Sequence, residues 1–241
     1  MALGQTVGKQ VFDDVGASSS FSFGTGPAAG STVVVAFWGW HAAGYDASSV
    51  TDNQGNSYSL IKPTGAGHSM GVIAFAANVA SSGTFTITIN HASGTGNYVV
   101  ATAAEFTGLA SSPADQSATA SDPGPQANDA TVTSGATTQA DEVVVAVAAV
   151  AVSGSTNIAI TTPAGFTNLA AEQNHNAHCG GSADFKIVAA TGAQTAAWSH
   201  NDVGSSADDG WTAAVLTLKA TVVAALFPPF PSREPTTQLR M

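Results

Sequence analysis

The chain has 241 residues, of which only 9% are charged, and it carries a formal net charge of −10 with six Lys and Arg in all. This length suffices for one large domain or two small ones with a hydrophobic core. With so few basic residues and no basic cluster, we expect neither nucleic-acid binding nor association with an anionic membrane. The apolar fraction of 44% indicates a folded chain rather than a disordered one.

The start of the chain, MALGQTVGKQVFDD, contains no apolar segment of the kind that a Sec signal peptide requires. The longest apolar run, VVVAVAAVAV at 143–152, is too short to cross a bilayer. Cys179 is the only cysteine, so no intrachain disulfide can form. We therefore expect a chain that is made in a cytoplasm, without a signal peptide, and is stabilised by its core alone, without a cofactor.

Runs of β-branched and aromatic residues follow one another along the chain, separated by turns rich in Gly, Asn, Asp and Ser. In TFTITI, for example, Phe85, Ile87 and Ile89 alternate with threonines and so share one face of a strand. No segment combines the apolar periodicity of a helix with an N-cap and a length of three turns. The sequence therefore predicts an all-β protein. The runs of the first half are 20–24, 31–40, 56–61, 70–79, 83–90 and 97–106.

The second half repeats the pattern of the first at an offset of about 110 residues. STVVVAFWGW at 31 aligns with DEVVVAVAAV at 141, and HSMGVIAF, ending at Phe75, aligns with HCGGSADF, ending at Phe185. The size of each half suits six to eight short strands packed as two sheets. We therefore predict two pseudo-repeated antiparallel β-sandwich halves, of jelly-roll or Ig-like type. Their expected bounds are 1–110 and 131–220, with a linker at 111–130.

Residues 221–241 differ from the rest of the chain, because four prolines interrupt them and no strand pattern is present. Prolines of this density disfavour helix and sheet interior and favour an extended arm. The arm carries an apolar stretch that is either packed on its own domain or bound to a partner. The partner expected is a second copy of the chain or another protein of the same assembly. The residues of this stretch are Leu226, Phe227, Pro228, Pro229 and Phe230.

The strand expected at 31–40 is apolar on both faces, since Trp38 and Trp40 have one parity and Val35 and Phe37 the other. Such a strand is buried on both sides or covered by a partner. An alternative is that Trp38 and Trp40, together with Tyr45 and Trp211, form an exposed aromatic platform on which sugars stack.

The segment GHSMG at 67–71 matches G-x-S-x-G, the turn that presents a nucleophilic serine in α/β-hydrolases. That turn needs a buried strand before Ser69 and a helix after it, whereas here Pro63 and two glycines precede it and a strand follows. Asp115 and His175 do follow in the order of a hydrolase triad. We nevertheless predict a chance match and a protein that is not an enzyme, and hold catalysis by Ser69 as an alternative.

Three further groups of polar residues invite a metal-site interpretation. His175 and His178 lie beside the thiol of Cys179, and on a loop the two histidines could hold zinc with a third ligand such as His200, but the usual structural set of four is not supplied. DNQGN at 52–56 resembles the opening of a calcium loop but lacks its later acids, and is typical of a tight turn. Asp202, Asp208 and Asp209 are expected in a solvated loop. We predict no metal site.

SVTDNQGNSYSLI, GVIAFAANVASSGTFTITI and AAEFTGLASSPADQ resemble segments of a group of largely uncharacterised β-sandwich proteins of bacteria and tailed phages. The group shows an Asp-x-x-Gly-Asn-x-Tyr turn, here Asp52 to Tyr58, and a Glu-aromatic-x-Gly strand end, here Glu105 to Gly108. The resemblance covers residues 15 to about 220. It implies a sandwich fold and, through the phage members, a structural part of a virion, without catalytic residues.

The expected function is that of a non-enzymatic structural protein on a virion surface, either a capsid decoration or a tail component. Its expected partners are further copies of itself and other virion proteins such as the major capsid protein, with glycans as possible ligands. A carbohydrate-binding or adhesion module is the main alternative, and a serine hydrolase is a further one.

Overall fold

The structure, a computed structural model, describes residues 1–64, 68–92, 95–122, 129–151, 158–175, 178–200 and 210–222; of residues 172–175 it describes the backbone. Every regular element in these ranges is a β-strand, and the strands pair antiparallel. The all-β prediction is thereby confirmed. Within the same ranges, no helix is long and apolar enough to span a membrane.

The first half consists of two sheets. A five-stranded sheet has the order β1-β8-β3-β6-β5, and a three-stranded sheet has the order β2-β7-β4. The bounds of the larger sheet are β1 (Ala2–Val15), β8 (Asn97–Thr107), β3 (Thr32–Trp40), β6 (Ser69–Ala76) and β5 (Ser59–Ile61). Those of the smaller sheet are β2 (Ser18–Phe23), β7 (Phe85–His91) and β4 (Ala47–Asp52).

The second half is built on the same plan with a smaller outer layer. Its five-stranded sheet has the order β12-β13-β11-β15-β9, and a two-stranded sheet pairs β10 with β14. The bounds are β12 (Thr167–His175), β13 (Cys179–Ala189), β11 (Asp141–Ala151), β15 (Trp211–Ala220), β9 (Leu109–Asp122), β10 (Ala130–Ala136) and β14 (Ala193–Trp198). When strands are matched in chain order, the two large sheets have the same order, although the repeat in the amino-acid sequence itself stays a prediction.

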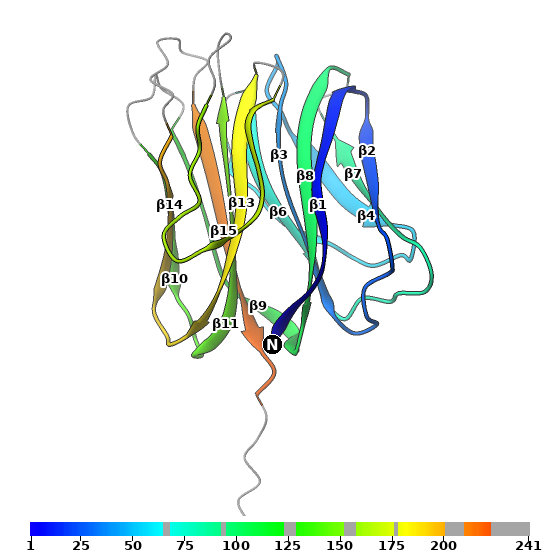
Figure 1. The fold of residues 1–241 in the computed structure, drawn as a ribbon, viewed down its shortest axis with the longest axis vertical. Helices are drawn as coiled ribbons and strands as arrows, with labels where there is room; N and C mark the ends of the chain where they lie inside the picture. Colours follow the sequence, from blue (N-terminus) through cyan, green and yellow to red (C-terminus); the bar gives the residue numbers. More distant parts are fainter. Residues whose placement is uncertain are drawn as a thin grey trace, which may run out of the picture.

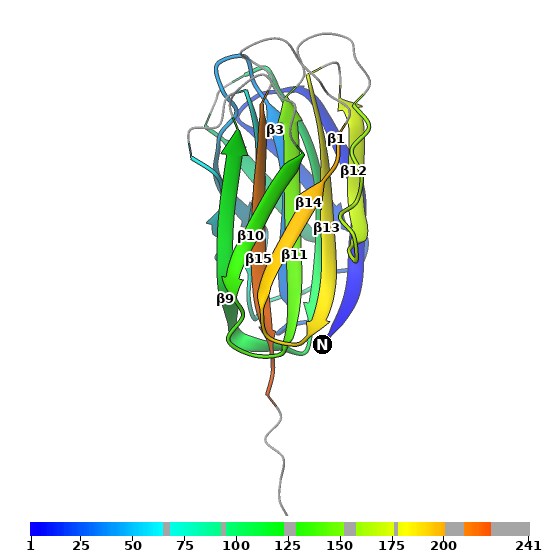
Figure 2. The same cartoon turned by 90° about the vertical axis from the view of Figure 1, so that its left-hand side faces the viewer.

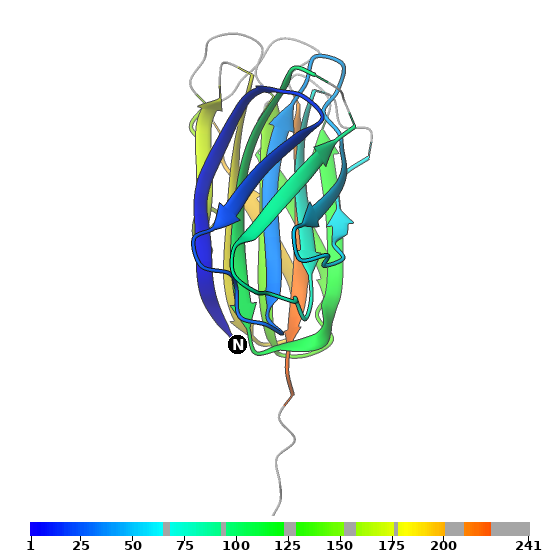
Figure 3. The same ribbon diagram turned by 90° about the vertical axis from the view of Figure 1, so that its right-hand side faces the viewer.

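The four sheets stack as four layers (Figure 1). The two large sheets face each other in the middle, with β2-β7-β4 outside the first and β10-β14 outside the second. Figure 2 shows the β10-β14 layer in front of β11 and β15, and Figure 3 shows β2, β7 and β4 on the opposite side. The molecule therefore has one core inside each half and a third core between the halves.

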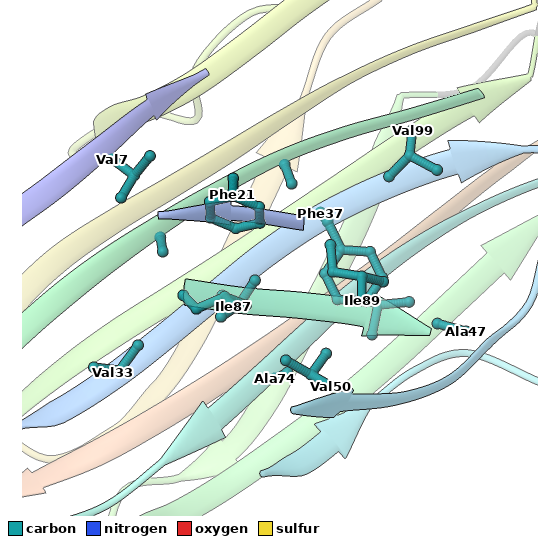
Figure 4. Packing of buried hydrophobic residues seen from close by; sticks show 14 of the residues in the cluster. Val7, Phe21, Val33, Phe37, Ala47, Val50, Ala74, Ile87, Ile89 and Val99 are labelled. Carbon is teal, nitrogen blue, oxygen red and sulfur yellow. The ribbon is translucent and has the colours of Figure 1, made fainter. Parts of the chain in front are cut away.

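Strand β3 shows how the sequence specifies this stack. Val33, Val35 and Phe37 point into the core of the first half, where they meet residues of β7 such as Ile87 and Ile89 (Figure 4). The intervening Val34, Ala36 and Trp38 point into the core between the halves. The expectation that this strand is buried on both sides is confirmed, and the layer that covers its second face is the other half of the same chain. Burial of this much apolar area is the main stabilising term of such a stack.

The contacts between the halves are reciprocal. The ring of Trp38 lies on Gly181, so closely that a Cβ there would be 2.6 Å from three ring atoms. In exchange, Gly71 lies on the backbone of Ala148 and Ala149, 3.4–3.5 Å from the position a Cβ would take. Residues 71 and 181, like 38 and 148, are 110 positions apart. Contacts that occur twice with the partners exchanged are the pattern of an approximate two-fold axis.

The segment expected to be a linker is in large part a strand. Residues 109–122 form β9, the edge of the second large sheet, and Ala130 opens β10. The halves therefore meet at Gly108, whose φ of +72° suits a glycine. Sequence analysis missed β9 because its inward side chains are small, such as Ala118 and Ala120, and because Pro113 is tolerated at a sheet edge. It also missed β1, in which three register shifts interrupt the alternation.

Candidate functional site

The four residues of the alternative aromatic platform do not lie together on the surface. Trp38 is 0% exposed, Tyr45 is 1% exposed and Trp211 is 8% exposed. Trp38 fills the core between the halves, and the Tyr45 ring covers Gly39 inside the first half. These three side chains are not presented to a ligand, because each is buried in a different core: Trp38 between the halves, Tyr45 in the first half and Trp211 in the second. Trp40 alone of the four is half-buried.

Trp40 belongs to an aromatic cluster at the end of the molecule away from Met1. The imidazole of His178, from the second half, stacks on the Trp40 ring with centroids 4.0 Å apart, and it also lies 4.5 Å from the ring of Tyr98. His68 stacks on Trp40 at 6.0 Å. With two imidazoles stacked on the indole, Trp40 joins the halves at this end rather than offering a free ring to a sugar.

Ser69 is the first residue of strand β6, next to the last residue of β3. Its hydroxyl is buried and has no hydrogen-bond partner within the described part of the chain. An activated serine needs a base within hydrogen-bond distance, so neither the strand context nor the contacts correspond to a nucleophile elbow. Gly67 lies outside the described residues, and Ser69 and Gly71 lie in a strand where the elbow would begin a helix.

The residues considered as zinc ligands, although no metal site was predicted, are not brought together where the structure describes them. His178 stacks on Trp40, Cys179 is buried in the core between the halves, and His200 lies in an isolated bridge with Ile160. Among the described residues, no group of three or more His, Cys, Asp or Glu side chains is placed to hold a metal ion. The side chain of His175 lies outside the described residues, as do Asp202, Asp208 and Asp209.

The segment DNQGNSY forms a turn organised by the carboxylate of Asp52. The backbone N–H groups of Gln54 and Asn56 donate to Oδ1, at 2.9 and 3.1 Å, and the Asn56 amide and the Tyr58 hydroxyl donate to Oδ2, both at 2.9 Å. Gly55 has a φ of +80°. Burial, followed by the charge of Asp52, raises the pKa of Tyr58. The expected tight turn is confirmed, and the carboxylate of Asp52 accepts its hydrogen bonds from within the turn.

Glu105 has a comparable structural role at the end of β8. Its carboxylate is buried and accepts hydrogen bonds from the backbone N–H groups of Ala28, at 2.7 Å, and Gln5, at 3.1 Å. These bonds fasten the loop after β2 to the large sheet and add a side-chain contact between its strands β1 and β8. Gly108 completes the motif, because a Cβ there would be 2.9 Å from the Cα of Met1. The two motifs thus specify connections in the fold.

A chain of neutral polar groups, not foreseen from the sequence, lies inside the first half. The His91 Nε2 atom is 2.9 Å from the Ser19 hydroxyl, and its Nδ1 atom is 3.1 Å from the Tyr45 hydroxyl. Burial lowers the pKa of His91 from 6.5 to about 4, so the imidazole is neutral at pH 7. A serine and an imidazole at this distance could act in proton transfer, but Ser19 is only 4% exposed. The group therefore has a structural role in the core.

The second half buries a carboxylate among polar side chains. Asp184 accepts hydrogen bonds from the Trp198 indole at 2.7 Å, the Ser182 hydroxyl at 2.8 Å and the Asn168 amide at 2.9 Å. Burial raises the pKa of Asp184, although these three hydrogen bonds oppose the shift. The sequence gives no sign of this network, because its four residues come from three strands.

Two further carboxylates lie at the base, the end of the molecule at which β15 finishes. Burial raises the pKa of Glu142, and the neighbouring Asp115 adds to this rise. For Asp115, burial is outweighed by hydrogen bonds from the backbone N–H and hydroxyl of Thr138, so that its pKa is lowered. The Lys219 amine lies 3.7 Å from the Asp115 carboxylate. Carboxyl groups whose pKa values are shifted in opposite directions are common in acid–base sites. Glu142, however, is 0% exposed, so its carboxyl group is not accessible to a substrate.

The base also holds both ends of the described chain. The Thr221 N–H donates to the Gly108 carbonyl at 2.9 Å, and its hydroxyl donates to the Leu109 carbonyl at 2.8 Å. Met1 lies against the same Gly108. The apolar stretch at 226–230, predicted to bind a partner, lies outside the described residues.

The fold defines the class of this protein as a four-layer β protein built from two sandwiches. A scan against protein-family models, a search of curated proteins and a search of solved structures each found no match. The resemblance based on residues 52–58 and 105–108 therefore stays a prediction.

Proposed function

We propose that this chain is a non-enzymatic structural protein of a phage virion, either a capsid decoration or a tail component. The observation that supports this most is the core between the halves, which joins two sandwiches into a single four-layer body (Figure 1). Of the acids and histidines that sequence analysis considered for chemistry, those with described contacts are engaged within the fold: Asp52 in a turn, His178 in a ring stack and Asp115 in hydrogen bonds from Thr138. A body of this kind serves as a spacer or a surface cover.

The two ends of the body differ in a way that fits assembly. At the base, Thr221 is fastened to Gly108 and Leu109, so the segment after Val222 continues from that end. The Trp40 cluster lies at the other end. In the proposed arrangement the arm, through Leu226 to Phe230, holds the base on a neighbouring subunit, and the loop end points outward.

The first test compares the mass in solution of the full-length chain with that of a chain ending at Val222, by sedimentation velocity. A full-length variant with Phe227→Ser and Phe230→Ser is the matched control, because it keeps the length of the arm. We expect a defined oligomer for the full-length chain and monomers for the other two. The same oligomeric state for all three chains would contradict self-assembly through the arm.

The second test concerns the virion itself. An antibody raised against the purified chain should label phage particles that are released from cells carrying this gene, and mass spectrometry of washed particles should detect the chain. Its absence from purified particles that are otherwise complete would contradict the proposal.

A further inference from the structure

The outer face of the β2-β7-β4 sheet, here called the hydroxyl-amide face, consists of nine uncharged polar side chains. The register of the strands places them in three rows of three across the sheet. On β2 and β7 these positions alternate with inward apolar or small residues of the first core, and on β4 with Val50 and the turn acid Asp52. Figure 3 shows this sheet from the outside. The rows are Ser18, Asn90 and Ser49; Ser20, Thr88 and Thr51; and Ser22, Thr86 and Asn53.

Hydrogen bonds between neighbouring strands fix these side chains in place. The hydroxyls of Ser20 and Thr88 are 2.8 Å apart, and the Asn90 amide donates to the Ser49 hydroxyl at 3.0 Å. Asn53 donates to the Thr84 carbonyl and accepts from the Thr86 N–H, both at 2.9 Å. Side chains that are already ordered lose little conformational entropy when a ligand binds.

A cavity of about 420 Å³ continues the hydroxyl-amide face beyond the ends of β2 and β7. Its lining contains no charged and no aromatic side chain, and the size falls in the range of small-molecule sites. The lining residues are Gly24, Thr25, Gly26, Pro27, Ser81, Ser82, Gly83 and Thr84.

The side chains of this surface indicate the chemical class of a ligand. The face has no Lys or Arg for phosphate groups and no aromatic or large apolar side chain for the core of a protein interface. Hydroxyls both donate and accept hydrogen bonds, which matches a ligand with many hydroxyls of its own. A polyanion would be repelled by a chain of net charge −10, whereas a neutral ligand would not.

We propose that the hydroxyl-amide face and its adjoining cavity bind a neutral polysaccharide. This site differs from the aromatic platform considered from the sequence, since none of Trp38, Trp40, Tyr45 and Trp211 belongs to it. The inference does not depend on the virion proposal, because binding is measured on the purified chain.

The opposite outer layer provides a matched control. On β10 and β14 the hydroxyls of Thr133 and Thr195 are 2.8 Å apart, the same distance as between Ser20 and Thr88. Among the described residues this ladder belongs to a two-stranded sheet, so its rows lack a third strand. Thr133→Val therefore removes an equivalent hydroxyl from a surface that lacks the rest of the proposed site.

The experiment is affinity electrophoresis of the full-length chain in gels that contain dextran, mannan, galactan or, as an anionic comparison, alginate. We expect at least one neutral polysaccharide to retard the chain. Thr88→Val, which removes the central hydroxyl and keeps the side-chain shape, should weaken that binding about fivefold, the usual effect of one lost hydrogen bond. Thr133→Val should leave it unchanged, and both variants should unfold at the wild-type urea midpoint.

Three results would overturn the proposal. The first is no retardation by any of the three neutral polysaccharides, or retardation by alginate alone. The second is an equal effect of Thr88→Val and Thr133→Val, which would move binding away from this face. The third is self-association of the wild-type chain that Thr88→Val abolishes, which would make a second copy of the chain the occupant.

Discussion

The two halves have large sheets of the same strand order, yet they bury different polar groups. The first half holds the neutral chain of Ser19, His91 and Tyr45 and bonds its buried Glu105 carboxylate to backbone N–H groups. The second half bonds the buried carboxylate of Asp184 to side chains. Within the described ranges the outer layers also differ, with three strands in one half and two in the other. The comparison teaches that the apolar strands fix the frame, while the polar content of each core varies without altering it.

The largest expected effect comes from the two glycines at which the halves touch. Gly181→Ala would place a Cβ 2.6 Å from the ring of Trp38, which is fully buried and has no space to move. We expect a loss of about 3 kcal/mol in the free energy of unfolding, at the upper end of overpacking effects. Gly71→Ala meets its neighbours at 3.4–3.5 Å and should cost less than about 1 kcal/mol. Urea unfolding of both variants measures the difference, and equal losses would contradict the packing described for Trp38.

A second prediction separates the halves by pH. Because the pKa of His91 falls from 6.5 in the unfolded chain to about 4 in the folded one, the unfolded chain binds more protons between these values. The stability that His91 contributes is complete above pH 6.5 and is lost as the pH falls to 4, by about 3 kcal/mol. His91→Gln should flatten this part of the stability curve, measured by urea unfolding at several pH values.

The stability that Asp184 contributes should change with pH in the opposite direction to that of His91. Its raised pKa means that its contribution is present in acid and is lost as the pH rises through the folded-state value. Asp184→Asn should therefore leave the fall between pH 6.5 and 4 in place. If His91→Gln left the curve unchanged in that range, the assignment of the acid response to the first half would be wrong.

A third prediction uses two threonines that are 110 positions apart. The Thr212 hydroxyl accepts the N–H of Gly71 across the halves at 2.8 Å, whereas the Thr102 hydroxyl donates to the Val7 carbonyl within the first half at 2.6 Å. Thr212→Val leaves the buried N–H of Gly71 without its acceptor and should lower the free energy of unfolding by about 2 kcal/mol. Thr102→Val should lower it by about 1 kcal/mol. Amide hydrogen exchange should speed up at Gly71 in the first variant and not in the second; the reverse would contradict the cross-half bond.

The smallest expected effect concerns the Asp52 turn. Tyr58→Phe removes one of four hydrogen bonds to the carboxylate and should lower the free energy of unfolding by about 1 kcal/mol. In the unmodified protein, the phenol should also resist ionisation at pH values where free tyrosine titrates, because its pKa is raised. Absorbance during an alkaline titration follows this ionisation; one phenol fewer in the resistant class is expected for the variant.

Particular residues show what could be predicted from the sequence. Alternation at Phe85, Ile87 and Ile89 was enough to identify β7 and its buried face, and the two-sided apolar pattern of 31–40 was enough to predict a strand covered on both faces. The turn at 52–58 followed from its Asp, Gly and Asn. Strands β1 and β9 were missed, because bulges and small side chains obscure their alternation.

The sequence by itself determined the all-β class, the turns and the strands that lie in the core, because these depend on neighbouring residues and a period of two. Only the tertiary structure decided that the second half covers Trp38, that His178 stacks on Trp40, and that Asp184 meets Trp198. It also decided which polar strands face outward together. Such contacts join residues far apart in the chain, and their geometry depends on how whole sheets pack, which no local pattern encodes.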